Sequence, residues 1–215
     1  VTSLQSVEIK KLPEDLINQI KAGEVVERPY NVVKEIVENS IDAGAKQIQV
    51  ELLDGGKQLI RITDDGCGIS ADQILTALER HATSKIKQFN DLESLINFGF
   101  RGEALPSIAS VSNFTIKSRP KSQEMGKEIN LNCGKLLSEK ETAMPFGTVI
   151  QVKDLFTNVP VRLKFLKSTA TEFTHIHDFL IAMALANYHI TFRFSHNGRD
   201  VFHYYSKKSL FERFS

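Results

Sequence analysis

The stretch KEIVENSIDAGA, residues 34–45, decides the fold, because its spacing predicts an amphipathic helix. Its apolar side chains share one sector of that helix, which favours packing of a single stripe against a sheet; they are Val32, Val33, Ile36, Val37 and Ile41. Glu35 and Asn39 are four residues apart and project from another side, with Asp42 close by. Gly44 then ends the helix, since glycine readily adopts the left-handed conformation found at helix C-termini.

Glu35 and Asn39 form a pair suited to hydrolysis. A carboxylate can orient or deprotonate a water molecule, and an amide oxygen one turn away can ligate a hard cation. The alternative is an ordinary helix whose polar face is only solvated, since charged helix faces are common.

On either side of this helix the pattern changes. Pro29 suits the first turn of the helix, where its missing N–H is not needed, and a short helix is expected from about Pro13. Residues 47–52 alternate between polar and apolar as a half-buried strand does, residues 54–56 turn the chain, and residues 59–63 are predicted to form a second strand.

The sequence Asp64-Asp-Gly66-Cys-Gly68 follows this second strand directly. Glycine lets a flat ligand approach the main chain, and a neighbouring carboxylate can accept from an exocyclic amino group such as that of adenine. The alternative is a turn in which Asp and Gly act only as turn residues. Ser70 and Gln73 then form a capping-box signature for a helix; its apolar residues would be Ile74, Leu75 and Leu78.

Two further segments suggest contacts with an anion. Residues 81–85, HATSK, carry hydroxyls and an ammonium that could meet phosphates, although without context a plain exposed loop is the safer interpretation. After a short helix expected near residues 91–96, residues 98–105 place glycines before helix-compatible residues 106–109, and such a loop presents unpaired N–H groups to an anion. The Walker pattern G-x-x-x-x-G-K-[ST] and a G-x-G-x-x-G after a strand are both absent, which argues against a P-loop and a Rossmann site.

The second half is predicted to be mostly β, with strands over residues 113–118, 126–131, 135–138 and 147–152. A short turn or helix is expected over residues 161–166. Its charges either contact phosphates or are solvated; they are Arg162, Lys164 and, just beyond, Lys167.

A long helix is predicted over residues 171–187, followed by a hairpin whose turn is Asn197-Gly198. His175 and His177 diverge on that helix and do not form a metal pair. The expected fold class is α+β, with a mixed, largely antiparallel sheet covered by helices on one face.

Composition is that of a soluble globular protein, with 41% hydrophobic and 25% charged residues among 215. The net charge of +1 neither favours nor excludes a nucleic-acid partner. Cys67 and Cys133 are far apart, so neither a disulfide framework nor a zinc site is indicated. No apolar run approaches the roughly 20 residues of a membrane span, and no secretory signal is seen. A cytosolic or nuclear protein is expected.

The order of these motifs resembles that of the superfamily that groups gyrase, a heat-shock chaperone, sensor histidine kinases and MutL. Four segments look specifically like MutL and its eukaryotic relatives, the DNA mismatch repair ATPases; they are residues 21–29 (KAGEVVERP), 38–44 (ENSIDAG), 80–85 (RHATSK) and 99–105 (GFRGEAL). The resemblance covers about residues 12–197. It implies a Bergerat-type two-layer sandwich that binds ATP, formed by residues 1–200, with residues 201–215 beginning a second, truncated domain or a linker.

The resemblance also implies roles for single residues. Glu35 would be the general base that activates the attacking water, and Asn39, with Asp42 nearby, would hold Mg²⁺ at the phosphates. Asp64 would accept from the adenine amino group, helped through water by Thr148. Gly66 and Gly68 would make room for the base.

A mobile lid and a phosphate cradle are implied as well. Thr83, Ser84 and Lys85 would belong to the lid. The cradle would be formed by the backbone of the GFRGEAL segment; its residues are Gly99, Phe100, Arg101, Gly102, Glu103, Ala104 and Leu105.

For the whole protein, the resemblance implies that ATP binding and hydrolysis with Mg²⁺ drive pairing of two N-terminal domains and clamp closure around DNA. Mismatch-recognition and downstream repair proteins would be the other partners, in the bacterial cytoplasm or the nucleus of a eukaryote. Family members carry a second domain that supplies a lysine to the γ-phosphate, so slow hydrolysis is expected from this chain.

Two other functions are compatible with the motifs. A histidine-kinase or topoisomerase ATPase module would keep the fold, although residues 22–29 and 99–105 favour MutL. A nucleotide-responsive DNA-binding scaffold, in which hydrolysis is incidental, is the second.

Overall fold

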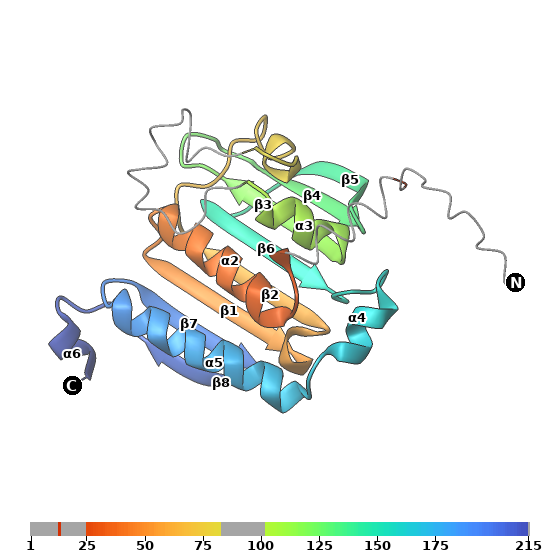
Figure 1. Cartoon of the computed structure of the whole chain (residues 1–215). Coiled ribbons are helices and arrows are strands. Elements are labelled where there is room, and N and C mark those ends of the chain that lie inside the picture. Colours follow the sequence, from red (N-terminus) through yellow and green to blue (C-terminus); the bar gives the residue numbers. More distant parts are fainter. Residues whose placement is uncertain (1–12, 14–24, 83–101, 215) are drawn as a thin grey trace, which may run out of the picture.

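The computed structural model describes residue 13, residues 25–82 and residues 102–214 (Figure 1). Most of the short helix expected from Pro13 and the helix expected near residues 91–96 lie outside these residues.

One mixed sheet forms the centre of the described structure. Its eight strands follow the order β5-β4-β3-β6-β2-β1-β7-β8, and every neighbouring pair is antiparallel except β1 with β7. The strands are β1 (Gln47–Leu53), β2 (Leu59–Asp64), β3 (Asn113–Arg119), β4 (Gly126–Asn132), β5 (Lys135–Thr142), β6 (Gly147–Lys153), β7 (Thr191–His196) and β8 (Arg199–Tyr204). The largely antiparallel sheet predicted from the sequence is confirmed, with β5 four residues longer than expected.

Three helices cover one face of this sheet (Figure 1). They are α2 (Pro29–Asp42), α3 (Ala104–Ser110) and α5 (Thr169–Ala186). Two shorter helices, α4 (Pro160–Phe165) and α6 (Leu210–Phe214), lie near opposite ends of α5. The predicted α+β architecture with helices on one face is therefore confirmed.

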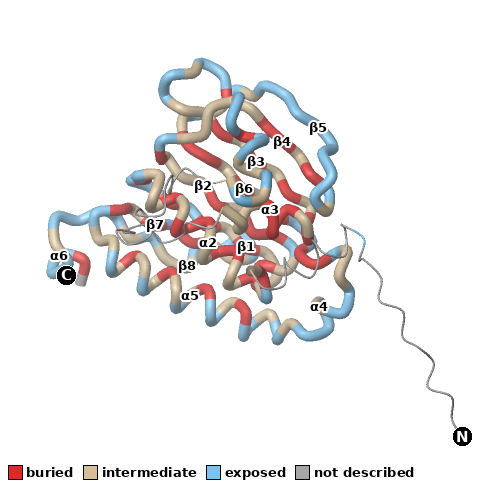
Figure 2. Tube along the Cα trace, turned by 45° about the horizontal axis from the view of Figure 1, so that its top comes forward, coloured by how far each residue is buried: buried red, intermediate tan, exposed pale blue. Residues whose placement is uncertain are grey.

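The core lies between the helices and the sheet because the inner strands bury alternate residues, whereas the edge strands β5 and β8 bury none fully. In β1, Ile48, Val50 and Leu52 are almost fully buried, while the residues between them are more exposed. The same alternation is visible along the central strands in Figure 2. On the other face, the Arg61 guanidinium donates to Glu51 over 2.8 Å, so polar pairs occupy the side away from the helices.

The prediction of a capped α-helix after Ser70 is wrong. The chain makes turns over residues 71–75 and a 3-10 helix over Thr76–Leu78. The Ser70 hydroxyl bonds the Asp72 carboxylate, which lowers the pKa of Asp72, so it is engaged in a local turn and does not cap a helix. Ile74 is fully buried while Leu75 is exposed, so the segment lacks the wide apolar stripe that stabilises a surface helix.

The C-terminal part of the described chain packs against the same sheet. β8 pairs with β7, and the guanidinium of Arg213 in α6 donates to the carbonyls of Tyr205, Tyr188 and Ile190, each over 2.8 Å. A domain boundary at residue 200 stays a prediction, although β8 crosses that position. Within the described residues, no helix is both long enough and apolar enough to span a membrane.

Candidate functional site

Helix α2 carries the predicted catalytic pair and is held at both ends. Pro29 is its first residue, and the Arg28 N–H donates to Asn31 Oδ1 over 3.1 Å in the first turn. At the other end, Gly44 has φ +73° and its N–H donates to the Ile41 carbonyl, as a left-handed terminal glycine does. The predicted helix is therefore confirmed.

The polar residues of α2 are less buried than the residues of its apolar stripe. Glu35, Asn39 and Asp42 are all partly buried, whereas Val33 and Ile36 are almost fully buried in the core. Glu35 lies about 6 Å from Asn39 along the helix axis. Their roles toward a ligand stay a prediction.

Three polar residues form a row across the sheet, on the face that the helices cover. Asp64 at the end of β2 lies directly opposite Thr148 on β6, and Thr148 lies directly opposite Ser118 on β3. Directly opposed residues project from the same face of a sheet. All three follow the parity of the buried core residues, so the row points toward the helices.

Asp64 is partly buried and accepts hydrogen bonds on both carboxylate oxygens. The Ser40 hydroxyl donates to Oδ2 over 2.8 Å, and the Gly66 N–H donates to Oδ1 over 2.9 Å. Burial raises the pKa of Asp64 above its ordinary 3.8, opposed by hydrogen bonding from Gly66, Ser40 and the Thr148 backbone. An ionised carboxylate has about four acceptor positions, so Asp64 retains capacity for a further donor and offers nothing to an acceptor.

Ser40 was missed by sequence reasoning, although it lies inside the stretch that predicted α2. A hydroxyl in a helix gives no sequence signal for a partner 24 residues away. Its bond joins the C-terminal half of α2 to the end of β2.

The glycines of the Asp-x-Gly-x-Gly loop are required by the packing of the loop itself. A Cβ on Gly66 would lie 2.8 Å from the Ala43 Cβ, and one on Gly68, where φ is +72°, would lie 2.5 Å from the Arg119 carbonyl oxygen. The Cys67 N–H donates to the Ala43 carbonyl over 2.9 Å. The loop is therefore fitted between α2 and β3, and any additional role in admitting a base stays a prediction.

Thr148 is nearly buried and has a neighbour that the sequence did not reveal. The oxygens of its hydroxyl and of Ser118 are 2.9 Å apart. Ser118 also accepts from the Ile69 N–H over 2.8 Å, which ties the far end of the glycine loop to β3. A lone serine in an alternating strand carries no signal of this kind.

The predicted lid and phosphate cradle are described only at their margins. Thr83, Ser84, Lys85, Gly99, Phe100 and Arg101 lie outside the described residues. Gly102 is described, with φ +63°, and a Cβ there would lie 2.4 Å from the Ala82 carbonyl oxygen, so the two residues flanking the 83–101 segment are in contact. Ala104 and Leu105 begin α3.

Glu103 links the two motifs at this margin. Its Oε1 lies 2.9 Å from His81 Nδ1, and its Oε2 lies 3.7 Å from Arg80 Nη1. The RHATSK and GFRGEAL segments therefore meet through side chains as well as backbone. Sequence reasoning assigned Glu103 only by its place in the motif.

The described residues contain no group of three or more His, Cys, Asp or Glu side chains that could hold a metal ion. A cation at α2 would therefore depend on a small number of protein ligands. Asn39 supplies a neutral amide oxygen, which suits Mg²⁺ when phosphates and water complete its coordination.

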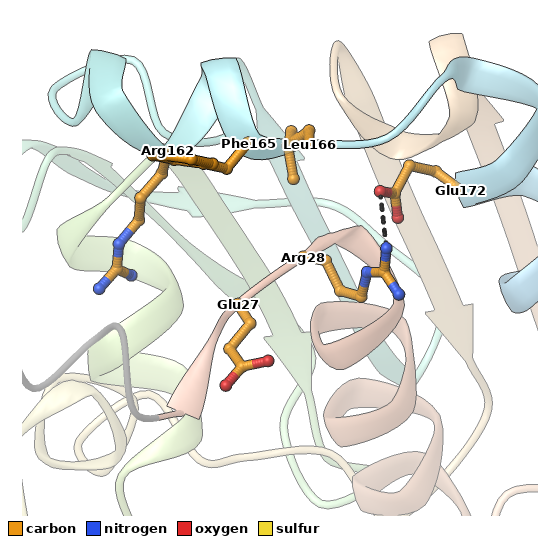
Figure 3. Close-up of a pocket in the computed structure, with 6 residues that line it drawn as sticks. All are labelled: Glu27, Arg28, Arg162, Phe165, Leu166 and Glu172. Atoms are coloured by element: carbon orange, nitrogen blue, oxygen red, sulfur yellow. Dashed lines mark hydrogen bonds and ion pairs between the residues drawn. The ribbon is translucent and has the colours of Figure 1, made fainter.

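A pocket of about 320 Å³ lies at the N-terminal end of α2 (Figure 3). It is lined by Glu27, Arg28, Arg162, Phe165, Leu166 and Glu172. The fully buried Glu172 accepts from Arg28 over 3.2 Å and so ties α5 to the start of α2. Ser40 is about 18 Å further along α2, which separates this pocket from the Asp64 row.

Comparison with known proteins relates this arrangement to a family. Residues 27–159 match the family described as histidine kinase-, DNA gyrase B-, and HSP90-like ATPase. The chain is 50% identical over 208 residues to the DNA mismatch repair protein MutL of Syntrophotalea carbinolica, covering 97% of this chain and 33% of that protein. It is 54% identical over 194 residues to MutL of Neisseria meningitidis, covering 90% of this chain and 30% of that protein.

A solved structure gives the same result. The Aquifex aeolicus MutL ATPase domain complexed with ADP superposes with a TM-score of 0.71 at 37% identity, covering 88% of this chain and 68% of that one. The chain thus spans about a third of the length of the curated relatives it matches and most of one ATPase domain. It belongs to the histidine kinase-, gyrase B- and HSP90-like ATPases and, among them, to the MutL family, as its N-terminal ATPase region.

Proposed function

We propose that this chain binds ATP together with Mg²⁺ and hydrolyses it, as the ATPase part of a DNA mismatch repair protein. The observation that carries the proposal is the Ser40–Asp64 hydrogen bond, because it joins the helix bearing Glu35 and Asn39 to a carboxylate with free acceptor capacity. The MutL relative of known structure from Aquifex aeolicus binds ADP, which supports an adenine nucleotide as ligand.

The purine end of the proposed site is Asp64 with Thr148. Asp64 accepts from the exocyclic amino group of adenine, and Thr148 assists through water. Gly66 and Gly68 hold the loop in the shape that keeps this carboxylate in place. The chemistry fits adenine, since an ionised carboxylate has about four acceptor positions and can take a further donor beside those it already has.

The phosphate end is assigned to α2 and the adjoining loops. Glu35 holds the attacking water and takes its proton, while Asn39, with Asp42 nearby, presents oxygen toward the cation. When bound, Mg²⁺ neutralises charge that develops on the phosphates. Residues 83–85 form the lid, and residues 99–105 cradle the phosphates.

For the whole protein, nucleotide state is proposed to control pairing of N-terminal domains and closure around DNA, together with mismatch-recognition and downstream repair proteins. Bacterial relatives suggest a cytoplasmic setting. Hydrolysis by these 215 residues alone is proposed to be slow, because the family resemblance implies a lysine from a second domain, for which residues 201–215 would be the start or the linker.

Three substitutions test the proposal. Glu35→Ala should bind ATP with little change and lose turnover, whereas Asn39→Ala and Asp64→Asn should weaken binding itself. Turnover is measured with radiolabelled ATP and protein in excess, and binding by calorimetry with magnesium present. Glu51→Gln is the control, because Glu51 pairs with Arg61 on the face of the sheet away from the helices.

The competing scaffold function has a different signature. A DNA-binding scaffold would show salt-dependent DNA binding that ignores nucleotide and is unchanged by Glu35→Ala. Absence of ATP binding by the wild-type chain, or equal turnover by wild type and Glu35→Ala, would contradict the proposed function.

A further inference from the structure

The pocket at the N-terminal end of α2 (Figure 3) is lined by a carboxylate that has one unpartnered oxygen. This carboxylate belongs to Glu172 of α5, which is 0% exposed. Glu172 Oε1 accepts from the Arg28 guanidinium over 3.2 Å and from the Lys167 N–H over 3.0 Å. Glu172 Oε2 is buried as well, but no described residue donates to it. Leaving a buried charged oxygen without a donor is costly, so Oε2 indicates a donor that a ligand supplies.

The pocket is large enough to admit such a ligand. Its volume of about 320 Å³ lies at the lower end of the range for small-ligand sites. Figure 3 shows the Glu172 carboxylate turned toward Arg28, with Glu27 bordering the same space from another side. Glu27 is exposed, so its carboxylate is accessible to a ligand. The pocket therefore offers carboxylate acceptors on two sides.

The two arginines that line the pocket are already engaged. Arg28 donates to Glu172, and Arg162 donates to the Val26 carbonyl over 3.2 Å. The Arg162 guanidinium also lies over the Phe156 ring, 5.7 Å from its centroid. The formal charges of the lining residues cancel, so an anion gains no net attraction. The unfilled acceptor on Glu172 instead selects a ligand that donates.

The remaining wall of the pocket is apolar. Phe165, the last residue of α4, is 78% exposed, and Leu166 beside it is partly buried. An exposed aromatic ring offers its face to a cation, and a planar guanidinium stacks on such a face, which a compact ammonium cannot do. The aliphatic stem of an arginine side chain would cover Leu166 while its guanidinium reaches the carboxylates.

We propose that this pocket binds an arginine side chain presented by a partner protein. The guanidinium donates to Glu172 Oε2 and to Glu27, since its fork of N–H groups can serve two acceptors at once, and it packs on Phe165. Because Glu172 has no exposed surface, the Arg28 side chain, which is 27% exposed, shifts to admit it. The pocket is about 18 Å along α2 from Ser40, so it is separate from the proposed nucleotide site.

The test uses three short capped peptides that carry arginine, lysine or citrulline between two alanines. Each is titrated into the 215-residue chain, and the backbone amide signals are followed by NMR. The arginine peptide should shift the signals of the lining residues with a Kd on the order of 1 mM, as expected for a few contacts. The lysine peptide should bind about fivefold more weakly. Citrulline keeps the shape and lacks the charge, so its peptide should bind at least about tenfold more weakly.

Two surface substitutions test the contacts without disturbing the fold. Phe165→Ala and Glu27→Gln should each weaken binding of the arginine peptide by about fivefold, through loss of the ring face and of one acceptor charge. The matched controls are Phe211→Ala, at an 81% exposed phenylalanine of α6, and Glu79→Gln, at an exposed glutamate, and both should bind as wild type does. Glu172→Gln should weaken binding at least about tenfold. If Glu172→Gln does not fold, the two surface substitutions still decide the question.

Four results would overturn the proposal. The first is no shift of the lining residues by the arginine peptide at about ten times the expected Kd. The second is equal binding of the arginine and citrulline peptides, or wild-type binding by both Phe165→Ala and Glu27→Gln. The third is binding of agmatine at least about tenfold more tightly than the arginine peptide, which would assign the pocket to a small metabolite. The fourth is displacement of the same signals by inorganic phosphate, which would make it an anion site.

Discussion

The Ser40 hydroxyl donates to Oδ2 of Asp64 over 2.8 Å and thereby fastens α2 to the end of β2. The same hydroxyl oxygen lies 3.1 Å from the Ile36 carbonyl, one turn back along the helix. The helix that carries Glu35 and Asn39 is therefore positioned by the carboxylate assigned to the base. Binding and hydrolysis share this contact, so changes at Ser40 should be felt at both ends of the site.

Ser40→Ala should weaken ATP binding by about ten- to a hundredfold, because a hydrogen bond to a charged group contributes about 1.5–3 kcal/mol. Calorimetric titration with ATP and magnesium measures the change. Thr174→Ala is the matched control, since the Thr174 hydroxyl donates to the Ala170 carbonyl one turn back along α5, at an exposed position. Unaltered ATP affinity in Ser40→Ala would rule out this coupling.

ATP affinity should fall on acidification, and the pH at which it falls should be higher than the pH expected for an aspartate of ordinary pKa. Burial raises the pKa of Asp64 above 3.8. The ionised carboxylate is a pure acceptor for the amino group of the base, and protonation weakens it in that role. In Ser40→Ala the ionised form loses a donor, so the pKa of Asp64 rises further and the midpoint moves to higher pH. Comparing the two proteins cancels the titration of the triphosphate, and coincident midpoints would contradict the assignment.

Gly147→Ala should be far more damaging than Gly44→Ala. Gly147 has φ +116°, and an added Cβ would lie 2.0 Å from the Asp64 carbonyl oxygen, so β6 and β2 would have to separate. Gly44 has φ +73° with nothing within 4 Å, so only backbone strain is added. Expected losses in the free energy of unfolding are about 3 kcal/mol or more and about 1 kcal/mol respectively. Urea unfolding measures both, and equal losses would count against this explanation.

Glu128→Gln should destabilise the protein by about 1 kcal/mol at neutral pH, with an effect that fades in acid. Hydrogen bonding from Asn130 and Lys117 lowers the pKa of Glu128 to about 2 from its ordinary 4.5. Because the pKa of Glu128 is lower in the folded than in the unfolded protein, its ionised carboxylate stabilises the fold fully above pH 4.5. This stabilisation is lost as the pH falls from about 4.5 toward about 2.

Urea unfolding of wild type and Glu128→Gln across this pH range measures the effect. Asp200→Asn is the comparison, because Asp200 pairs with Arg193 on an exposed hairpin, where ion pairs contribute little. A difference between wild type and Glu128→Gln that stays constant with pH would disprove the assignment.

The architecture could be predicted from periodicity because each element carries a strong repeating pattern. The apolar stripe of α2 and the alternation of β1 and β7 fixed their types, and turn residues such as Asn197-Gly198 fixed where hairpins close. The segment after Ser70 was predicted incorrectly because a local capping signature is only two residues long and competes with side-chain turns. The parallel pairing of β1 with β7 could not be read locally, since it joins residues that are far apart in sequence.

Some residues of the candidate site could likewise be predicted from the sequence, and others could not. Asp64, Gly66, Gly68 and Thr148 belong to motifs and could be singled out from their order, and the structure brings Asp64 beside Thr148. Ser40 and Ser118 could not, because a serine hydroxyl acquires its meaning only from a partner supplied by another element. The predicted roles of Glu35 and Asn39 remain predictions that the experiments above address.

The place of β1 in the sheet has a consequence for synthesis on the ribosome. β1 can pair with β2 as soon as residues 59–64 emerge, but its other edge is completed by residues 191–196. Until the chain has been translated that far, the nascent domain exposes the unpaired edge of β1, next to apolar side chains that are buried in the folded domain. Such edges invite association between chains, so this domain should depend on chaperone protection late in translation.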